Sequence, residues 1–164
     1  MAQEDLPALV IDCNLWISIL TQPENELKEI LFKGTFRVVL TSYMVVEILR
    51  VLQRLASRRL LRYAEVESLF WDFCAYPFII KDFQQPITDS LVNEVRKVPE
   101  YLIIAQLLEL EVKDVPYLVA AYQHSALLLS NDIRSLVAKR DPIQKHLGIQ
   151  LITLDEFRRE FTGI

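Results

Sequence analysis

The chain contains 164 residues, of which 52% are hydrophobic and 24% are charged, and its formal net charge is −4 at pH 7. This length supports one substantial hydrophobic core and is short for two ordinary domains, so we expect a single domain over residues 1–164. The acidic balance excludes a protein that coats nucleic acid along its whole surface, because such binding depends on a broad basic face.

The sequence shows little sign of a membrane span, a secretory signal or a zinc site. No apolar run reaches the roughly 18 residues that a membrane-spanning helix requires. Residues 1–5 carry acids where a secretory signal carries basic residues. The two cysteines, Cys13 and Cys74, stand in apolar sequence without the spacing of a zinc site. We therefore expect a soluble, cytoplasmic protein with buried thiols.

The first half of the chain predicts alternating strands and helices, from apolar runs and from the residues that begin and end helices. In chain order they are a strand over residues 7–13, a short amphipathic helix between Pro23 and Gly34, a strand over residues 36–40, and a long helix over residues 43–59 capped by Thr41 or Ser42.

The second half continues this alternation. The predicted elements are a helix over 63–76, a short strand over 78–80, a helical stretch over 87–110 with a break at Pro99, a helix opened by Asp114, strands over 126–129 and 150–152, and a terminal helix with Thr153 and Glu156 as a capping box. Such a pattern is typical of a three-layer α/β/α domain around a central, mainly parallel sheet.

Two aspartates, Asp12 and Asp132, each follow a buried strand directly. Ligands of open parallel sheets bind outside the carboxyl ends of the strands, so we expect both side chains in one crevice. With right-handed crossovers, the starts of the following helices face the same crevice. Glu47 and Asp114 then become neighbours of this pair.

Four carboxylates in one crevice repel one another, and a divalent cation relieves that repulsion. The set contains oxygen ligands without His or Cys, which favours Mg²⁺ or Mn²⁺ over zinc. Such an ion lowers the pKa of a bound water and orients a phosphodiester. The chemistry predicted from these residues is phosphodiester hydrolysis.

The long helix also carries a basic face. Glu47 is followed on the same face by Arg50, Arg54 and Arg58, at spacings of three and four residues. Guanidinium groups bind phosphate oxygens with paired hydrogen bonds, so these arginines are candidate RNA-binding residues despite the acidic net charge. Arg134, with Lys139 and Arg140 behind it, would extend this basic face.

Each of these residues also has an ordinary structural interpretation. Asp12, Asp114 and Asp132 precede helical sequence and would serve as N-caps, and Glu47 would pair with Arg50. The aromatic stretch over residues 69–78 suits a core, or a groove for a partner or second subunit. We assign His124 and His146 no role, because neither has an acid at a suggestive position in the sequence.

Four motifs in chain order resemble the PIN-domain family, in particular its toxin ribonucleases. They are VIDCN (10–14), SYMVVEIL with Glu47, KDVPYLVAAY (113–122) and LLLSND (127–132). The resemblance implies that Asp12, Glu47, Asp114 and Asp132 coordinate Mg²⁺ or Mn²⁺, and that Asn14 and Ser130 support this centre.

The resemblance also implies a function. PIN-domain proteins cleave RNA with such a metal centre, and many are toxins of toxin–antitoxin pairs, often dimeric and inhibited by a small antitoxin protein. The expectation is therefore a PIN-like nuclease that acts on RNA, forms a homodimer and binds an antitoxin. Two alternatives stay open, which are a catalytically silent PIN-fold module that binds proteins and a structure-specific DNA nuclease.

Overall fold

The computed structural model describes residues 5–161. The acidic start of the chain, which argued against an export signal, therefore lies outside the described residues except for Asp5. No helix within residues 5–161 is both long and apolar enough to cross a membrane.

A five-stranded sheet forms the centre of the molecule, and every pairing in it is parallel. Its strands in chain order are β1 (Ala8–Ile11), β2 (Arg37–Thr41), β3 (Ile79–Asp82), β4 (Leu127–Leu129) and β5 (Leu151–Ile152). The spatial order is β3-β2-β1-β4-β5, so the chain builds outward from β1 on one side and later returns to build on the other. The strand order thus reverses between β1 and β4, where such sheets place their ligands.

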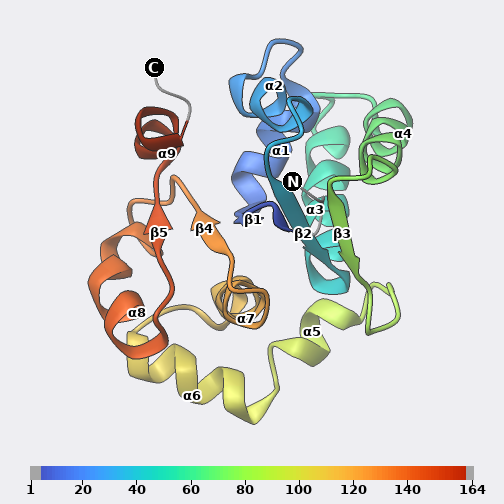
Figure 1. Cartoon of the computed structure of the whole chain (residues 1–164). Helices are drawn as coiled ribbons and strands as arrows, with labels where there is room; N and C mark the ends of the chain where they lie inside the picture. Colours follow the sequence, from blue (N-terminus) through green and yellow to red (C-terminus); the bar gives the residue numbers. More distant parts are fainter. Residues whose placement is uncertain (1–4, 162–164) are drawn as a thin grey trace.

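Helices occupy most of the remaining chain. They are α1 (Cys13–Thr21), α2 (Glu26–Phe32), α3 (Ser42–Ser57), α4 (Tyr63–Cys74), α5 (Leu91–Val95), α6 (Pro99–Leu108), α7 (Val115–Gln123), α8 (Arg140–Leu147) and α9 (Leu154–Phe161), with short 3-10 turns η2 (Val112–Asp114) and η3 (Val137–Lys139). Helices α1, α3 and α4 pack together beside β2, whereas α7 packs on β1 and β4 with α6 outside it (Figure 1). The predicted α/β architecture with helices around a parallel sheet is confirmed.

Several predicted boundaries were wrong for local reasons. Helix α2 does not begin at Pro23, because the side chain of Asn25 caps it by accepting a hydrogen bond from the Lys28 amide at 2.9 Å. It does end before Gly34, whose φ of +71° suits the left-handed conformation. The break predicted at Pro99 is confirmed, because α6 begins there, but the two helices on either side cover less than the predicted stretch of residues 87–110. Helix α8 was not predicted, and α1 was expected only as helical sequence after Asp12, without bounds.

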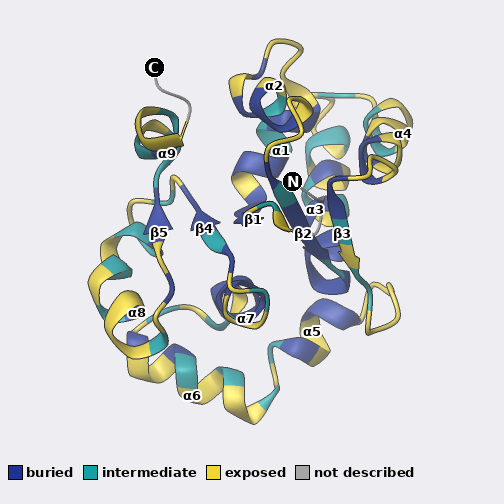
Figure 2. Ribbon diagram, in the orientation of Figure 1, coloured by how far each residue is buried: buried dark blue, intermediate teal, exposed yellow. Residues whose placement is uncertain are grey.

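The core consists of the strands and the inner helix faces, as the dark blue ribbon of Figure 2 shows. The aromatic stretch of α4 contributes to it, since Phe70 and Phe73 are buried and pack edge-on against the ring of Trp16. Both cysteines are buried and free, as predicted. The aromatic stretch is therefore mainly core, although Trp71 remains 39% exposed.

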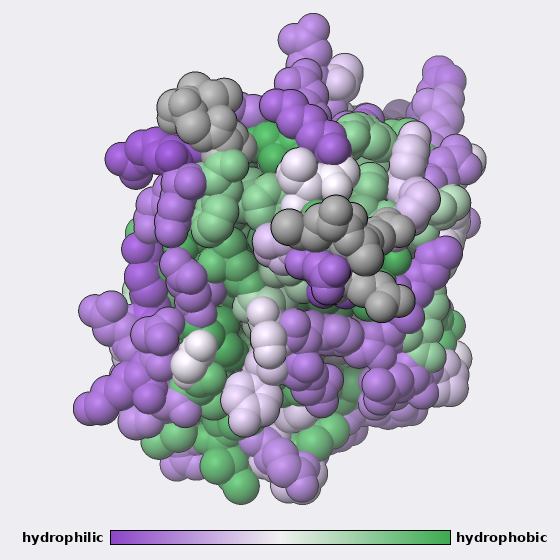
Figure 3. All heavy atoms as spheres, in the orientation of Figure 1, coloured by the Kyte–Doolittle hydropathy of each residue, from purple (hydrophilic) through white to green (hydrophobic). Residues whose placement is uncertain are grey.

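Polar side chains cover much of the face seen in Figure 3, with apolar atoms showing between them. One apolar surface lies on α6, where the side chains of Leu102, Ile103 and Leu107 are 48%, 66% and 60% exposed. Single exposed apolar residues are ordinary, but three on one short helix form an unusual cluster.

Candidate active site

The four acids predicted from the sequence line one pocket with a volume of about 180 Å³ at the carboxyl edge of the sheet. We call it the acidic pocket. Its charged and polar lining comprises Asp12, Asn14, Glu47, Arg50, Arg54, Arg96, Lys113, Asp114 and Asp132. Four carboxylates and four cations thus face the same small space.

Asp12 is fixed at the point where β1 gives way to α1. Its backbone conformation is extended, and Oδ1 accepts a hydrogen bond of 2.8 Å from the amide of Cys13, so it does cap α1. Its other oxygen, Oδ2, accepts a 2.8 Å hydrogen bond from the hydroxyl of Ser130. Burial raises the pKa of the Asp12 carboxyl, and these two hydrogen bonds oppose that rise.

Ser130 connects the two strand-end aspartates. Its side chain is fully buried at the end of β4, and its hydroxyl accepts a 3.1 Å hydrogen bond from the amide of Asp132 while donating to Asp12. The carboxylate of Asp132 accepts a 2.7 Å hydrogen bond from the hydroxyl of Ser135. One serine thereby sets the relative position of two acids from neighbouring strands.

Asp114 has the least satisfied carboxylate of the four. It precedes α7, but its side chain makes no capping hydrogen bond, so the N-cap interpretation fails for this residue. The residue is 6% exposed, and Oδ2 has no hydrogen-bond partner among the described residues. Burial first, and then the charge of Asp12, raise the pKa of Asp114 to about 7.

Glu47 is held by side chains from α3, from α7 and from the residue that follows α5. Its Oε1 accepts a 2.5 Å hydrogen bond from the hydroxyl of Tyr117, and Oε2 accepts one of 3.0 Å from the hydroxyl of Tyr43. The guanidinium of Arg96 lies 3.4 Å from Oε2 and also donates to the Tyr43 oxygen. The predicted pairing of Glu47 with Arg50 is therefore wrong, because these other groups occupy the carboxylate.

The predicted basic face is only partly at the pocket. Arg50 and Arg54 line it, whereas Arg58 at the end of α3 and Arg134 are exposed and do not. The predicted extension beyond Asp132 is also wrong. Lys139 pairs with Glu109 at 3.1 Å, and Arg140 makes two hydrogen bonds to Glu156.

The donor set fits a hard divalent cation. All four acids offer carboxylate oxygens, and the unpartnered Oδ2 of Asp114 is buried beside the negative charge of Asp12. Across residues 5–161, however, no three His, Cys, Asp or Glu side chains are grouped as a ready-made metal site. Binding a cation would therefore require the carboxylates to close around it.

Three functional neighbours of the acids were not predicted. Tyr43 lies four residues before Glu47 on α3, and this helical spacing was an available signal. Tyr117 lies inside the motif that resembles the PIN family. Arg96 directly follows α5 as its C-cap residue, and no motif marks it. The sequence also showed no sign of an acid beside His124, whose Nε2 lies 2.8 Å from Oδ2 of Asp82, 42 residues away.

Comparisons with known proteins support the fold. No family model matches the sequence, and no curated protein sequence matches it. A chain of VapBC2 from Rickettsia felis, in a crystal structure bound to a DNA fragment from their promoter, is similar with a TM-score of 0.59 and 14% identity, over 90% of this chain and 99% of that one.

A chain of FitAcB from Neisseria gonorrhoeae is also similar, with a TM-score of 0.49 and 18% identity over 88% of this chain and 96% of that one. The similarity to the VapBC2 chain, together with the wholly parallel sheet and the acid-lined pocket at its switch point, shows a PIN-like α/β/α fold.

Proposed function

We propose that the protein is a metal-dependent endoribonuclease that hydrolyses RNA phosphodiester bonds with Mg²⁺ or Mn²⁺. The observation that carries this proposal is the gathering of Asp12, Glu47, Asp114 and Asp132 around one pocket at the switch point of the sheet. Carboxylate clusters at this position suit cation-assisted phosphodiester chemistry. The resemblance to PIN-domain toxins supports RNA as the substrate.

In this proposal Asp12, Asp114 and Asp132 hold the cation, directly or through water. The bound cation supplies a water of lowered pKa and positive charge beside the phosphodiester. Glu47 is kept in place by the two tyrosine hydroxyls and holds or deprotonates the attacking water. Asn14 lines the pocket beside them, and Ser130 fixes the Asp12 carboxylate.

The cations of the pocket would bind the substrate. Arg50, Arg54, Arg96 and Lys113 surround the acids, so phosphate oxygens that enter the pocket meet positive charge on several sides. Local cations of this kind offset the net charge of −4 of the whole chain. RNA binding would be strongly dependent on salt, since each phosphate contact releases counterions.

The resemblance further supports a place in a toxin–antitoxin pair in the cytoplasm, with a small antitoxin protein as inhibitor and a homodimer as the working form. The side chains of Leu102, Ile103 and Leu107 on α6 are exposed to solvent. Such a group of exposed apolar side chains is consistent with a protein contact. An antitoxin would silence the nuclease by covering the acidic pocket or by closing access to it.

A catalytically silent protein-binding module is the second candidate. It is favoured by the absence, within the described part of the chain, of three acids already grouped as a metal site. A structure-specific DNA nuclease with the same acids is the third. Comparing cleavage of RNA and DNA of one sequence separates the two nucleases.

The test is cleavage of structured and single-stranded RNAs with Mg²⁺, Mn²⁺ or EDTA. Wild type is compared with Asp12→Asn and Asp132→Asn, and with Asp72→Asn as a matched control, because Asp72 is exposed on α4 away from the pocket. Metal-dependent cleavage that only the pocket variants lose supports the proposal. Equal cleavage by all four proteins points to a contaminating nuclease, and binding of metal without cleavage favours the silent module.

A further inference from the structure

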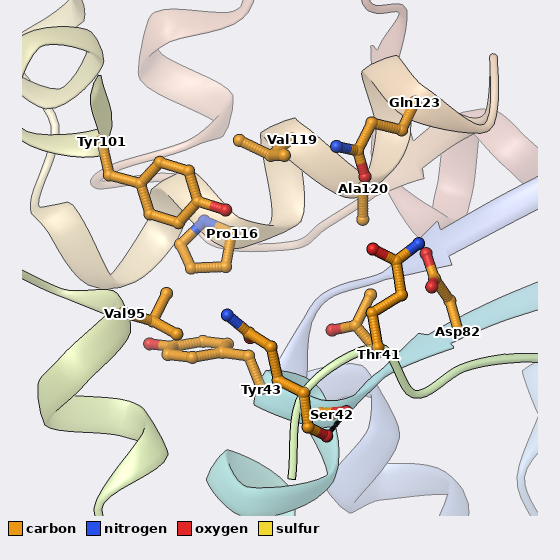
Figure 4. Close-up of a pocket in the computed structure, with 12 residues that line it drawn as sticks. Thr41, Ser42, Tyr43, Asp82, Val95, Tyr101, Pro116, Val119, Ala120 and Gln123 are labelled. Atoms are coloured by element: carbon orange, nitrogen blue, oxygen red, sulfur yellow. Dashed lines mark hydrogen bonds between the residues drawn. The ribbon is translucent and has the colours of Figure 1, made fainter. Parts of the chain in front are cut away.

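A second pocket with a volume of about 140 Å³ lies where β2 and β3 end, on the side of the sheet covered by α7. We call it the glutamine pocket after three of its polar residues. The residues used below are Tyr43, Asp82, Gln84, Gln85, Tyr101 and Gln123. Figure 4 shows the side chains of Tyr101, Gln123 and Asp82 extending from three different elements toward the same space.

Four polar side chains of this pocket make no hydrogen bond within the described residues, and the three glutamines among them are exposed to solvent. Within residues 5–161 no hydrogen bond engages the side-chain amides of Gln84, Gln85 or Gln123, and the hydroxyl of Tyr101 has none either. Each side-chain amide has an NH2 group that donates and an oxygen that accepts hydrogen bonds, so the three glutamines offer both donors and acceptors to a ligand in this pocket. None of these groups carries a full positive charge, which makes a bare phosphate a poor ligand here.

Asp82 adds a fixed acceptor. Its Oδ2 lies 2.8 Å from Nε2 of His124, and this contact orients the carboxylate at the end of β3. The other oxygen, Oδ1, has no partner in the described structure. An amino group of a ligand would therefore find a charged acceptor beside the glutamine amides, and a charged acceptor strengthens a hydrogen bond.

The size and walls of the pocket favour a small flat ligand. Its volume of about 140 Å³ is below the roughly 300 Å³ at which ordinary cofactor and drug sites begin. The rings of Tyr43 and Tyr101 and the ring of Pro116 line one side of it (Figure 4). Aromatic rings bind nucleobases by stacking, and amide and carboxylate groups read the base edges.

The glutamine pocket adjoins the acidic pocket. The ring of Tyr43 lines the former, and its hydroxyl donates to Glu47 in the latter. The end of α5 also reaches both pockets. Val95, its last residue, lines the glutamine pocket, and Arg96, which follows it, lines the acidic pocket. The side chain of Tyr43 thus connects the two spaces, and consecutive groups of one RNA chain would occupy both.

We propose that the glutamine pocket binds one unpaired nucleobase of the RNA next to the cleaved phosphodiester. The proposal rests on the proposed ribonuclease function and names a determinant of its sequence preference. The acceptor on Asp82 favours bases with an exocyclic amino group, which are adenine, guanine and cytosine, over uracil. The base must be unstacked, so the enzyme would cut single-stranded segments in preference to duplexes.

The test measures binding of the four nucleoside 5′-monophosphates and of ribose 5-phosphate in EDTA, using NMR of the glutamine side-chain amides. Amino-bearing nucleotides are expected to shift the amide signals of Gln84, Gln85 and Gln123, whereas ribose 5-phosphate is not. Tyr101→Leu is expected to raise the Kd about tenfold, and Gln123→Leu several-fold. Gln106→Leu, an exposed change on the same helix as Tyr101, should leave the Kd unchanged.

Equal shifts with ribose 5-phosphate, or nucleotide binding that is the same in wild type, Tyr101→Leu and Gln123→Leu, would overturn the proposal. Gln123 is exposed at the end of α7, so its variant reports on the pocket even if the Tyr101 variant folds poorly. The measurement needs neither metal nor turnover. Its failure is therefore distinct from failure of the ribonuclease proposal, which the cleavage assay with the Asp12 and Asp132 variants decides.

Discussion

The hydroxyl of Tyr117 donates a 2.5 Å hydrogen bond to Oε1 of Glu47, although the two residues are 70 positions apart in the sequence. The contact joins α7 to α3 across the acidic pocket. Burial raises the pKa of Tyr117 well above its ordinary value, so the phenol stays protonated and remains a donor. This hydrogen bond ties the orientation of the acid to the packing of the core.

Replacing Tyr117 by Phe removes that donor and preserves the shape of the ring. Because a hydrogen bond to a charged group is lost inside the fold, we expect the free energy of unfolding to fall by about 1–3 kcal/mol. Denaturant titration measures this change, with Tyr122→Phe as the control on the same helix, since Tyr122 is 66% exposed. Equal stability of the two variants would contradict the structural role of the contact.

Ser130 offers a second test of the site's geometry. Ser130→Ala leaves Oδ2 of Asp12 and the amide of Asp132 without their shared partner, inside a fully buried environment. We expect a loss of about 1–3 kcal/mol in unfolding free energy and slower RNA cleavage at saturating metal. Ser68→Ala, at an exposed position of α4, should change neither quantity. Cleavage at the wild-type rate by Ser130→Ala would exclude a supporting role for this hydroxyl.

Much of this site was accessible from the sequence because its positions are set by strand ends. Buried apolar runs predict the strands, and parallel strands bring their carboxyl ends to one edge, so Asp12 and Asp132 had to be neighbours once β1 and β4 paired. Helix spacing placed Glu47 and Arg54 on one face. These inferences use local patterns and one rule of sheet topology.

What the sequence could not show depends on contacts between distant elements. Arg96 reaches Glu47 from a helix 49 residues away, and His124 meets Asp82 over 42 residues, with no periodic pattern to mark either contact. The bounds of helix α1 were missed for a different reason. Its buried residues include Leu15, Trp16 and Ile19, so apolar side chains surround much of the helix and blur the amphipathic signal.

The arginines of α3 make a matched pair of variants. Arg54 lines the acidic pocket and Arg58 does not, although both are exposed cations, one in the last turn of α3 and the other at its C-cap. We expect Arg54→Gln to weaken RNA binding and to lower the salt dependence of the binding constant by nearly one phosphate contact, about 0.7 in the logarithmic slope for single strands. Arg58→Gln should have a much smaller effect. Equal effects in a salt titration would mean that the whole helix face, and not the pocket, contacts RNA.

The apolar surface of α6 predicts a protein contact, and charged side chains introduced on this surface should disrupt it. If it buries Ile103 and Leu107 in a homodimer, replacing both by Glu should convert the dimer to a monomer while leaving unfolding of the monomer cooperative. Analytical ultracentrifugation over a range of concentrations measures the change. The control replaces Glu100 and Gln106 of the same helix by Lys, since both are already polar and exposed. A wild type that stays monomeric at all concentrations would contradict the prediction.

Asp114 should make the metal-free protein less stable as the pH rises. Its pKa is about 7 in the folded protein, against about 4 in an unfolded chain, so the folded state holds its proton more tightly. The stability that this proton contributes is present in full below about pH 4 and is lost as the pH rises through 7. In EDTA at pH 8 the charged carboxylate therefore lowers the free energy of unfolding.

Asp114→Asn removes that charge, and we expect it to stabilise the metal-free protein at pH 8 by about 1–2 kcal/mol, a value reduced from the full shift because the open pocket admits water. The difference should vanish toward pH 4, where wild type is protonated too. Adding Mn²⁺ at pH 8 should reverse the order, because the cation stabilises wild type by mass action and finds fewer ligands in the variant. Thermal unfolding at both pH values, with and without Mn²⁺, measures all of these changes. A variant that is less stable than wild type in EDTA at pH 8 would contradict this prediction. It would show that contacts within the fold stabilise the Asp114 carboxylate without a cation.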